Sequence, residues 1–295
     1  MQKVMGYLRL ARPANIVTAV SDILAGVAIV GFFGSGFAGN LSLTPVILLC
    51  IATVGLYGGG IVFNDVFDRE LDQRERPERP IPSGLISAQA ASCWGGALLL
   101  LGCIFAFLAN TTAGVMALLV TASALIYNRW GKHSTWLGPI NMGLCRSFNL
   151  LLGMSVLPAV MPEFAYLAAV PLVYIAAVTT ISRGEVGGST KAPLFLSAFM
   201  YLLVINAIAF FAAQKDQVVA LFFLVPFALF IFRPLVRAIA RPVGPLIGKA
   251  VKAGVLSLIL MNAAWVAASG AWPVAIGVAL LLPLSLWLAR RFAVT

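Results

Sequence analysis

Long apolar blocks separated by short polar segments recur along the whole chain. The core of a bilayer is about 30 Å thick, so a helix that crosses it needs about 20 mostly apolar residues. Ten blocks reach or approach this length. They cover residues 15–34, 44–63, 89–108, 112–128, 137–159, 164–182, 193–213, 217–235, 248–269 and 272–289. The pattern predicts an all-α polytopic membrane protein with a single domain over residues 1–295.

Composition agrees with this prediction. The 295 residues are 61% hydrophobic and only 10% charged, which excludes a water-soluble globular domain. The net charge of +10 does not indicate binding to nucleic acid, because the cations are scattered between apolar blocks and form no contiguous basic face. The lipid bilayer is therefore the expected surrounding of this chain.

The cations lie almost entirely on one side of the predicted membrane. With a cytoplasmic N-terminus, eighteen lysines and arginines fall in cytoplasmic segments, and only Lys215 falls on the opposite side. A bias of this kind predicts a multi-pass protein of the cell inner (cytoplasmic) membrane and an even number of crossings. The longer polar loops share the cytoplasmic side, so we expect the functional site there.

Acidic residues are concentrated in one short stretch. Six of the ten aspartates and glutamates lie between Asp65 and Glu78, directly after an apolar block. On a continuous helix, Asn64, Asp68 and Asp72 would share one face, since residues four apart lie one above another. Like charges at this spacing repel, and carboxylates near membrane depth are costly, so the row suggests a compensating cation. Oxygen ligands of this kind favour Mg²⁺.

Arginines follow the acidic row directly. Arg74, Arg76 and Arg79 carry planar guanidinium groups that bind phosphate oxygens in bidentate fashion. Acids and arginines together indicate a site for Mg²⁺ and a diphosphate. The alternative is a solvated loop in which the acids pair with the arginines.

The motif resembles the first signature of the UbiA superfamily of intramembrane prenyltransferases. The matching residues are N-D-V-F-D-R-E-L-D at 64–72 and R-P-I-P-S-G at 79–84, and L-R-L-A-R-P-A-N at 8–15 is similar to the family's N-terminal element. The resemblance implies a bundle of nine to ten transmembrane helices with the active site on the cytoplasmic side. It also implies Mg²⁺, a prenyl diphosphate donor, and transfer of the prenyl group to an aromatic or lipophilic acceptor.

The resemblance also assigns roles to residues. It implies that Asn64, Asp68 and Asp72 hold Mg²⁺, while Arg76, Arg79, Tyr127 and Lys132 surround the diphosphate. Because Lys132 is one position away from the family's usual spacing, Arg129 is a rival for its role.

The family's second aspartate motif is degenerate in this chain. The corresponding stretch is T-I-S-R-G-E-V-G-G, with Thr180, Gly184 and Gly188 at the three aspartate positions. Three interpretations remain open. Glu185 holds a second metal ion alone, Arg183 replaces that ion as a fixed positive charge, or the protein no longer ionises a prenyl diphosphate. The last interpretation leads to the alternative function, a non-catalytic membrane carrier or binding protein for a lipophilic metabolite. The stretch is also similar to the EboC-like branch, whose members are encoded in bacterial secondary-metabolite clusters.

Two charged residues lie deep inside apolar blocks. Arg146 is expected about two turns from the cytoplasmic end, where it needs a partner or a substrate anion, and we predict that it is part of the catalytic site. Asp22 either accepts from a substrate hydroxyl, pairs with Arg146, or makes a structural hydrogen bond. The run Gly58–Gly60 would admit a close helix or a prenyl tail, close packing being favoured.

Overall fold

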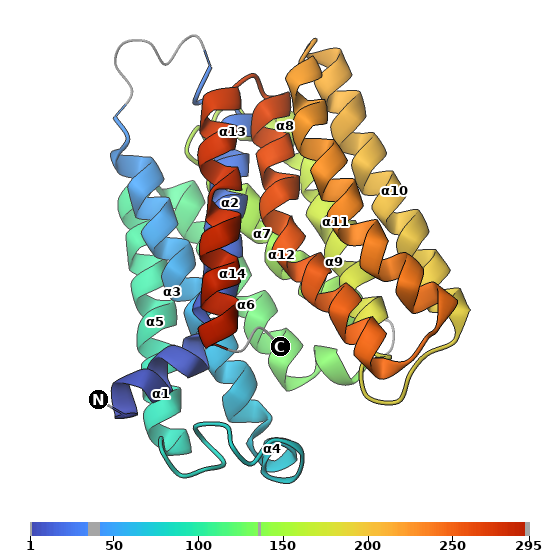
Figure 1. The fold of residues 1–295 in the computed structure, drawn as a ribbon. Coiled ribbons are helices and arrows are strands. Elements are labelled where there is room, and N and C mark those ends of the chain that lie inside the picture. Colours follow the sequence, from blue (N-terminus) through green and yellow to red (C-terminus); the bar gives the residue numbers. More distant parts are fainter. Residues whose placement is uncertain (1, 35–41, 135–136, 293–295) are drawn as a thin grey trace.

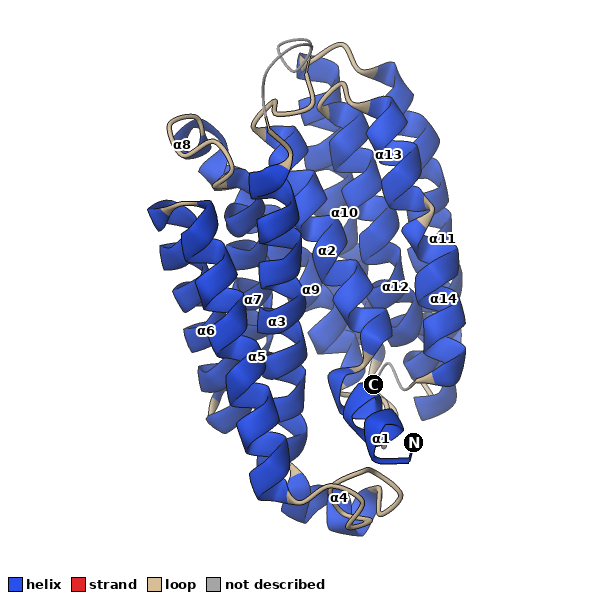
Figure 2. Ribbon diagram, turned by 90° about the vertical axis from the view of Figure 1, so that its left-hand side faces the viewer, coloured by secondary structure: helices blue, strands red, loops and turns tan. Residues whose placement is uncertain are grey.

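The computed structural model describes residues 2–34, 42–134 and 137–292, which form a bundle of long helices without a strand in these ranges (Figures 1 and 2). The first half contains α1 (Gln2–Ala11), α2 (Pro13–Ile29), α3 (Thr44–Phe67), α4 (Arg69–Glu75), α5 (Ala88–Ala109), α6 (Thr111–Arg129), the 3₁₀ turn η2 (Gly131–His133) and α7 (Leu137–Met154). The second half contains α8 (Met161–Phe164), η3 (Ala165–Ala168), α9 (Ala169–Ser182), α10 (Lys191–Gln214), η4 (Val218–Ala220), α11 (Leu221–Ala240), α12 (Gly244–Ala268), α13 (Trp272–Ala279) and α14 (Leu281–Arg291).

The helices confirm the predicted fold class. Within the described residues, eight helical segments are long and apolar enough to cross a membrane, and α1 with α2, bent by 44°, would make a ninth. Helix α7 matches the expected block at 137–159 but is not among them; its 18 residues include Arg146 and two asparagines. The expected count of nine to ten is consistent with these helices.

Helix α12 lies inside the bundle, and α2 and α7 pack closely against one another. The apolar window of α12 is 83% buried, the highest fraction among the candidate spans of the described chain. Glycines set the contact between α2 and α7: a Cβ on Gly26 would lie 2.3 Å from the Leu150 carbonyl oxygen, and one on Gly153 would lie 2.4 Å from that of Ile23. This close approach brings the polar residues of both helices into direct contact.

Glycines also bring α3 against α5. A Cβ on Gly59 would lie 2.7 Å from the Gly95 carbonyl oxygen, which confirms the close packing expected for this residue. Gly60 lies differently: it lines a cavity, and its carbonyl accepts a hydrogen bond from Asn128 Nδ2 at 2.8 Å. The glycine run therefore serves a helix contact on one side and a cavity wall on the other.

The prediction that the acidic row lies on one continuous helix is wrong. Helix α3 ends at Phe67, Asp68 forms the junction, and Asp72 belongs to α4. The four-residue hydrogen bonds still cross the junction, because the Asp68 amide donates to the Asn64 carbonyl at 3.0 Å and the Asp72 amide to the Asp68 carbonyl at 2.8 Å. The three residues remain close along the chain, but the break at Asp68 separates the helix that carries Asn64 from the helix that carries Asp72.

Candidate active site

The acidic row lies at one end of the bundle, near α4 and the start of α2 (Figure 1). Arg79 bridges Asp72 of the row and the neighbouring Asp65: Nη1 donates to Asp72 Oδ2 at 2.7 Å and to Asp65 Oδ1 at 3.3 Å. Arg12 donates to the same Asp65 oxygen at 2.6 Å. All four side chains are largely buried. The acids therefore pair with arginines as the alternative interpretation proposed, but the pairs are buried instead of solvated.

Arg12 and Asp65 were not among the residues assigned from the sequence. Arg12 lies between α1 and α2 with a left-handed backbone, φ 45°, which is uncommon for a residue other than glycine. Its side chain is 12% exposed, and it reaches an acid 53 positions away. The R-P pair in the opening segment was the available sequence signal for this residue. Its partner could not be read from local spacing.

The structure separates the two rivals at the end of α6. Lys132, in η2, forms an ion pair with Asp68. Arg129 is exposed, and its guanidinium carbon lies 5.9 Å from the centre of the Phe67 ring. Lys132 therefore contacts Asp68 of the acidic row, whereas Arg129 lies beside the Phe67 ring. Which of the two binds a diphosphate stays a prediction.

The degenerate second motif packs against the first turn of α12 and the segment before it. A Cβ on Gly184 would lie 2.7 Å from Ile247 Cδ1, and one on Gly188 would lie 2.9 Å from the Pro242 carbonyl oxygen. Gly188 also has φ +79°, a conformation that aspartate adopts less readily than glycine. A side chain at either of these two expected aspartate positions would therefore require neighbouring atoms to shift.

Glu185 is the acid that remains in this motif. It is half-buried, and burial raises the pKa of its carboxyl, while the nearby Arg76 acts in the opposite direction. Arg183 is exposed and donates from Nη2 to the Ser134 carbonyl at 3.0 Å. Arg76 and Glu185 are therefore close enough to interact electrostatically, and Arg183 ties the end of α9 to the loop after η2.

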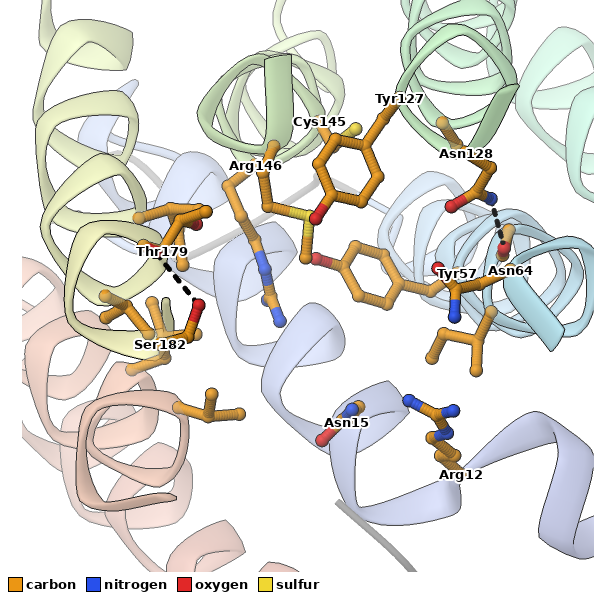
Figure 3. A pocket seen from close by; sticks show the side chains of 18 of the residues that line it. Arg12, Asn15, Tyr57, Asn64, Tyr127, Asn128, Cys145, Arg146, Thr179 and Ser182 are labelled. Atoms are coloured by element: carbon orange, nitrogen blue, oxygen red, sulfur yellow. Dashed lines mark hydrogen bonds between the residues drawn. The ribbon is translucent and has the colours of Figure 1, made fainter. Parts of the chain in front are cut away.

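A cavity of about 280 Å³ extends into the bundle from this region (Figure 3). Four predicted site residues line it: Asn64, Tyr127, Arg146 and Glu185. Arg12, Tyr57 and Asn128 also line it and were missed in the sequence analysis. The remaining wall is mostly apolar, with residues such as Leu56, Val120, Met142, Ile175, Val255 and Leu258. The cavity is thus a largely apolar chamber with polar side chains from several helices.

Arg146 and Asp22 form a buried ion pair, as one of the three expectations for Asp22 proposed. Arg146 Nη1 donates to Asp22 Oδ2 at 2.7 Å, and both side chains are at most 3% exposed. Asp22 accepts two further hydrogen bonds, from Asn149 Nδ2 at 3.0 Å and Asn262 Nδ2 at 2.7 Å. Arg146 also donates to Thr18 Oγ1 at 2.7 Å. The network joins α2, α7 and α12, so Asn262 packs helices together as part of it.

The model of the UbiA prenyltransferase family matches residues 24–242. The chain belongs to this family. Among similar proteins, the digeranylgeranylglyceryl phosphate synthase of Methanothrix thermoacetophila is 35% identical over 180 residues, 61% of this chain and 62% of that protein. The same-named protein of Saccharolobus solfataricus is 39% identical over 121 residues, 41% of this chain and 40% of that protein. The chain thus spans less than two thirds of the length of these relatives.

Solved structures of the UbiA family share the fold. A homolog from Aeropyrum pernix has a TM-score of 0.65 at 22% identity, covering 85% of this chain and 96% of that one. A homolog from Archaeoglobus fulgidus, solved bound to GPP and Mg²⁺, has a TM-score of 0.54 at 15% identity, covering 90% of this chain and 99% of that one. These likenesses confirm the UbiA-like helical bundle.

The donor atoms at the acidic row fit a magnesium ion that is shared with a substrate. Within the described residues, no three His, Cys, Asp or Glu side chains are grouped so as to hold a metal by themselves. Asp68 has one cationic partner, Lys132, and Asp72 has one, Arg79. Mg²⁺ usually binds through one or two carboxylates together with substrate phosphates, keeping part of its water shell. The donor set is therefore compatible with an ion that is also held by phosphate oxygens.

Proposed function

We propose that this UbiA family member transfers a prenyl group from a prenyl diphosphate to an aromatic or lipophilic acceptor inside the membrane. The observation that carries the proposal is the position of the charged cluster. Asp68 and Asp72 are paired with Lys132 and Arg79, and Asn64 from the same row lines an apolar cavity. A diphosphate at the cluster would place the reacting end of its prenyl chain at that cavity.

In this proposal, the acids bind the metal and the cations bind the leaving group. Asn64, Asp68 and Asp72 hold Mg²⁺, which supplies positive charge to the diphosphate. Arg76, Arg79, Lys132 and Arg183 neutralise the remaining charge, and Tyr127 contacts the same group. Because Arg79 and Lys132 already neutralise Asp72 and Asp68, an incoming diphosphate exchanges one anionic partner for another. Because each cation keeps an anionic partner throughout this exchange, no charge is left unpaired near the membrane, which would be costly.

The reaction breaks the bond between prenyl C1 and the diphosphate oxygen. The electron pair of this bond leaves with diphosphate. An acceptor nucleophile forms the new bond to C1 and then loses its proton. Glu185 is the acid available on the opposite loop, for a second metal ion or for interaction with Arg76. Since Gly184 and Gly188 supply no carboxylates, fixed cations carry more of the leaving-group charge in this chain.

We also propose that the protein lies in the cell inner membrane with its N-terminus and the charged cluster on the cytoplasmic side. The distribution of lysines and arginines supports this orientation. In the structure, the two ends of the described chain and α4 lie toward the same end of the bundle (Figure 1). Reporter tags fused to each terminus test it, and both are expected on the cytoplasmic side.

The test of the activity is product formation in membranes supplied with labelled geranyl, farnesyl and geranylgeranyl diphosphates and a cell extract. We expect a Mg²⁺-dependent prenylated product that disappears in Asp68→Ala. The second candidate is a carrier or binding protein for a lipophilic metabolite, favoured by the tightly packed second motif. Redistribution of a metabolite without any new prenylated species would support the carrier and refute the transferase.

A further inference from the structure

Arg146 has donors that the buried network does not use. A guanidinium carries five N–H groups. Two bonds go to Asp22 and Thr18, and Nε has no hydrogen-bond partner within the described part of the chain. The side chain is 3% exposed, and the residue lines the cavity. A buried donor without a partner is costly, so a bound oxygen at this position would be stabilised.

The position of the guanidinium is fixed from two sides. Its central carbon lies 4.3 Å from the centre of the Tyr57 ring, and both side chains reach into the same chamber (Figure 3). Asp22 holds it from the other side and is itself held by Asn149 and Asn262. A substrate group at Arg146 therefore meets a preorganised donor that pays little entropy on binding.

The charge of Arg146 is already neutralised by Asp22. The pair has no net charge, and the only acid that lines the cavity is Glu185, within the described residues. A carboxylate or phosphate at Arg146 would be an uncompensated buried charge, which is expensive in an apolar wall. A hydroxyl or carbonyl oxygen accepts from the unpartnered Nε–H without that cost.

The size of the chamber suits one ring or a short chain next to this donor. Its volume of about 280 Å³ is nearly twice the ~150 Å³ of an engineered cavity that binds benzene. We propose that Arg146 and Tyr57 form the acceptor subsite and bind an uncharged oxygen of a lipophilic acceptor. This assignment rests on the proposed prenyl transfer and names the acceptor class as an alcohol, phenol or ketone instead of an acid or phosphate ester.

The test uses three matched ring probes that differ only in the polar group: 4-butylphenol, 4-butylbenzoate and butylbenzene. Each competes with tritiated 4-butylphenol for the protein in nanodiscs, in a scintillation-proximity assay. We expect the phenol to bind about tenfold more tightly than butylbenzene, since a hydrogen bond to a charged donor is formed. A preference for the benzoate, or equal binding of all three, would overturn the assignment.

Substitutions identify the donor. Arg146→Lys keeps a positive charge beside Asp22 but replaces the planar fork with one nitrogen, so the phenol preference should fall to about twofold or less. The double variant Asp22→Leu, Arg146→Met removes the pair as a unit and should remove the preference as well. Asn206→Leu deletes an exposed amide on α10 whose side chain bonds to its own helix, and it should keep the preference of the original protein.

Binding of labelled geranylgeranyl diphosphate with Mg²⁺ is measured on the same samples. If Arg146→Lys binds this donor normally and loses the phenol preference, the acceptor subsite is supported. If it binds the donor normally and keeps the preference, the subsite is wrong and the proposed transfer is unaffected. If the original protein prefers the phenol but does not bind the donor, the proposed function fails while the oxygen-binding site stands.

Discussion

Removing either Arg146 or Asp22 alone should destabilise the protein strongly, whereas removing both together should cost much less, because the two form a buried ion pair. Arg146→Met leaves the Asp22 carboxylate, 1% exposed, with two amide donors but no cation. Removing one partner of a buried pair costs about 3–5 kcal/mol, whereas replacing both with apolar side chains of similar volume is often neutral. At roughly 2–4 °C per kcal/mol for a chain of this size, the single variant should lose about 10 °C in Tm.

The assay is thermal unfolding of purified protein in one detergent, for the two single variants and for Asp22→Leu, Arg146→Met together. We expect each single variant to unfold well below the original protein and the double variant to regain more than half of the loss. A double variant that loses the sum of both single effects would refute the reasoning, because the two side chains would then contribute independently.

Three further predictions concern packing, the cation at the acidic row, and pH. Gly26→Ala should lower Tm by several degrees because its Cβ would lie 2.3 Å from a carbonyl oxygen, whereas Gly96→Ala, with open space around it, should not lower it. Lys132→Met should weaken Mg²⁺-dependent binding of geranylgeranyl diphosphate about tenfold or more in an equilibrium binding assay, and Arg129→Met should change it less than twofold. The raised pKa of Glu185 means that the folded state holds this proton more tightly, so stability falls as pH rises from the ordinary glutamate pKa through the raised one. The measurement is the difference in Tm between Glu185→Gln and the original protein, in EDTA, at pH 4 and at pH 7. The variant should be more stable relative to the original protein at pH 7 than at pH 4, and a difference that does not change with pH would contradict this.

The sequence was sufficient for the fold class because each apolar block is long enough to decide its own structure. It also identified the acidic row, since the spacing of Asn64, Asp68 and Asp72 is local information. It could not show the break at Asp68, where α3 gives way to α4 and neighbouring ion pairs hold both helix ends. Periodicity describes a continuous helix and does not register such an interruption.

Contacts between distant segments explain the remaining differences. Arg12 meets Asp65 across 53 positions, and Arg146 meets Asp22 across 124. The second pair could be suggested from the sequence because two opposite charges deep in apolar blocks need partners. The first could not, because both residues lie near polar segments where water is an equally good partner.

The most direct test of the central claim is equilibrium binding of labelled geranylgeranyl diphosphate across a Mg²⁺ titration, for the original protein and for Asp68→Asn, Asp72→Asn together. We predict that Mg²⁺ strengthens binding at least about tenfold in the original protein. In the double variant Lys132 and Arg79 are released from their acids, so binding should persist and no longer respond to Mg²⁺. Binding that is equally independent of Mg²⁺ in both proteins, or equally dependent on it, would contradict the account.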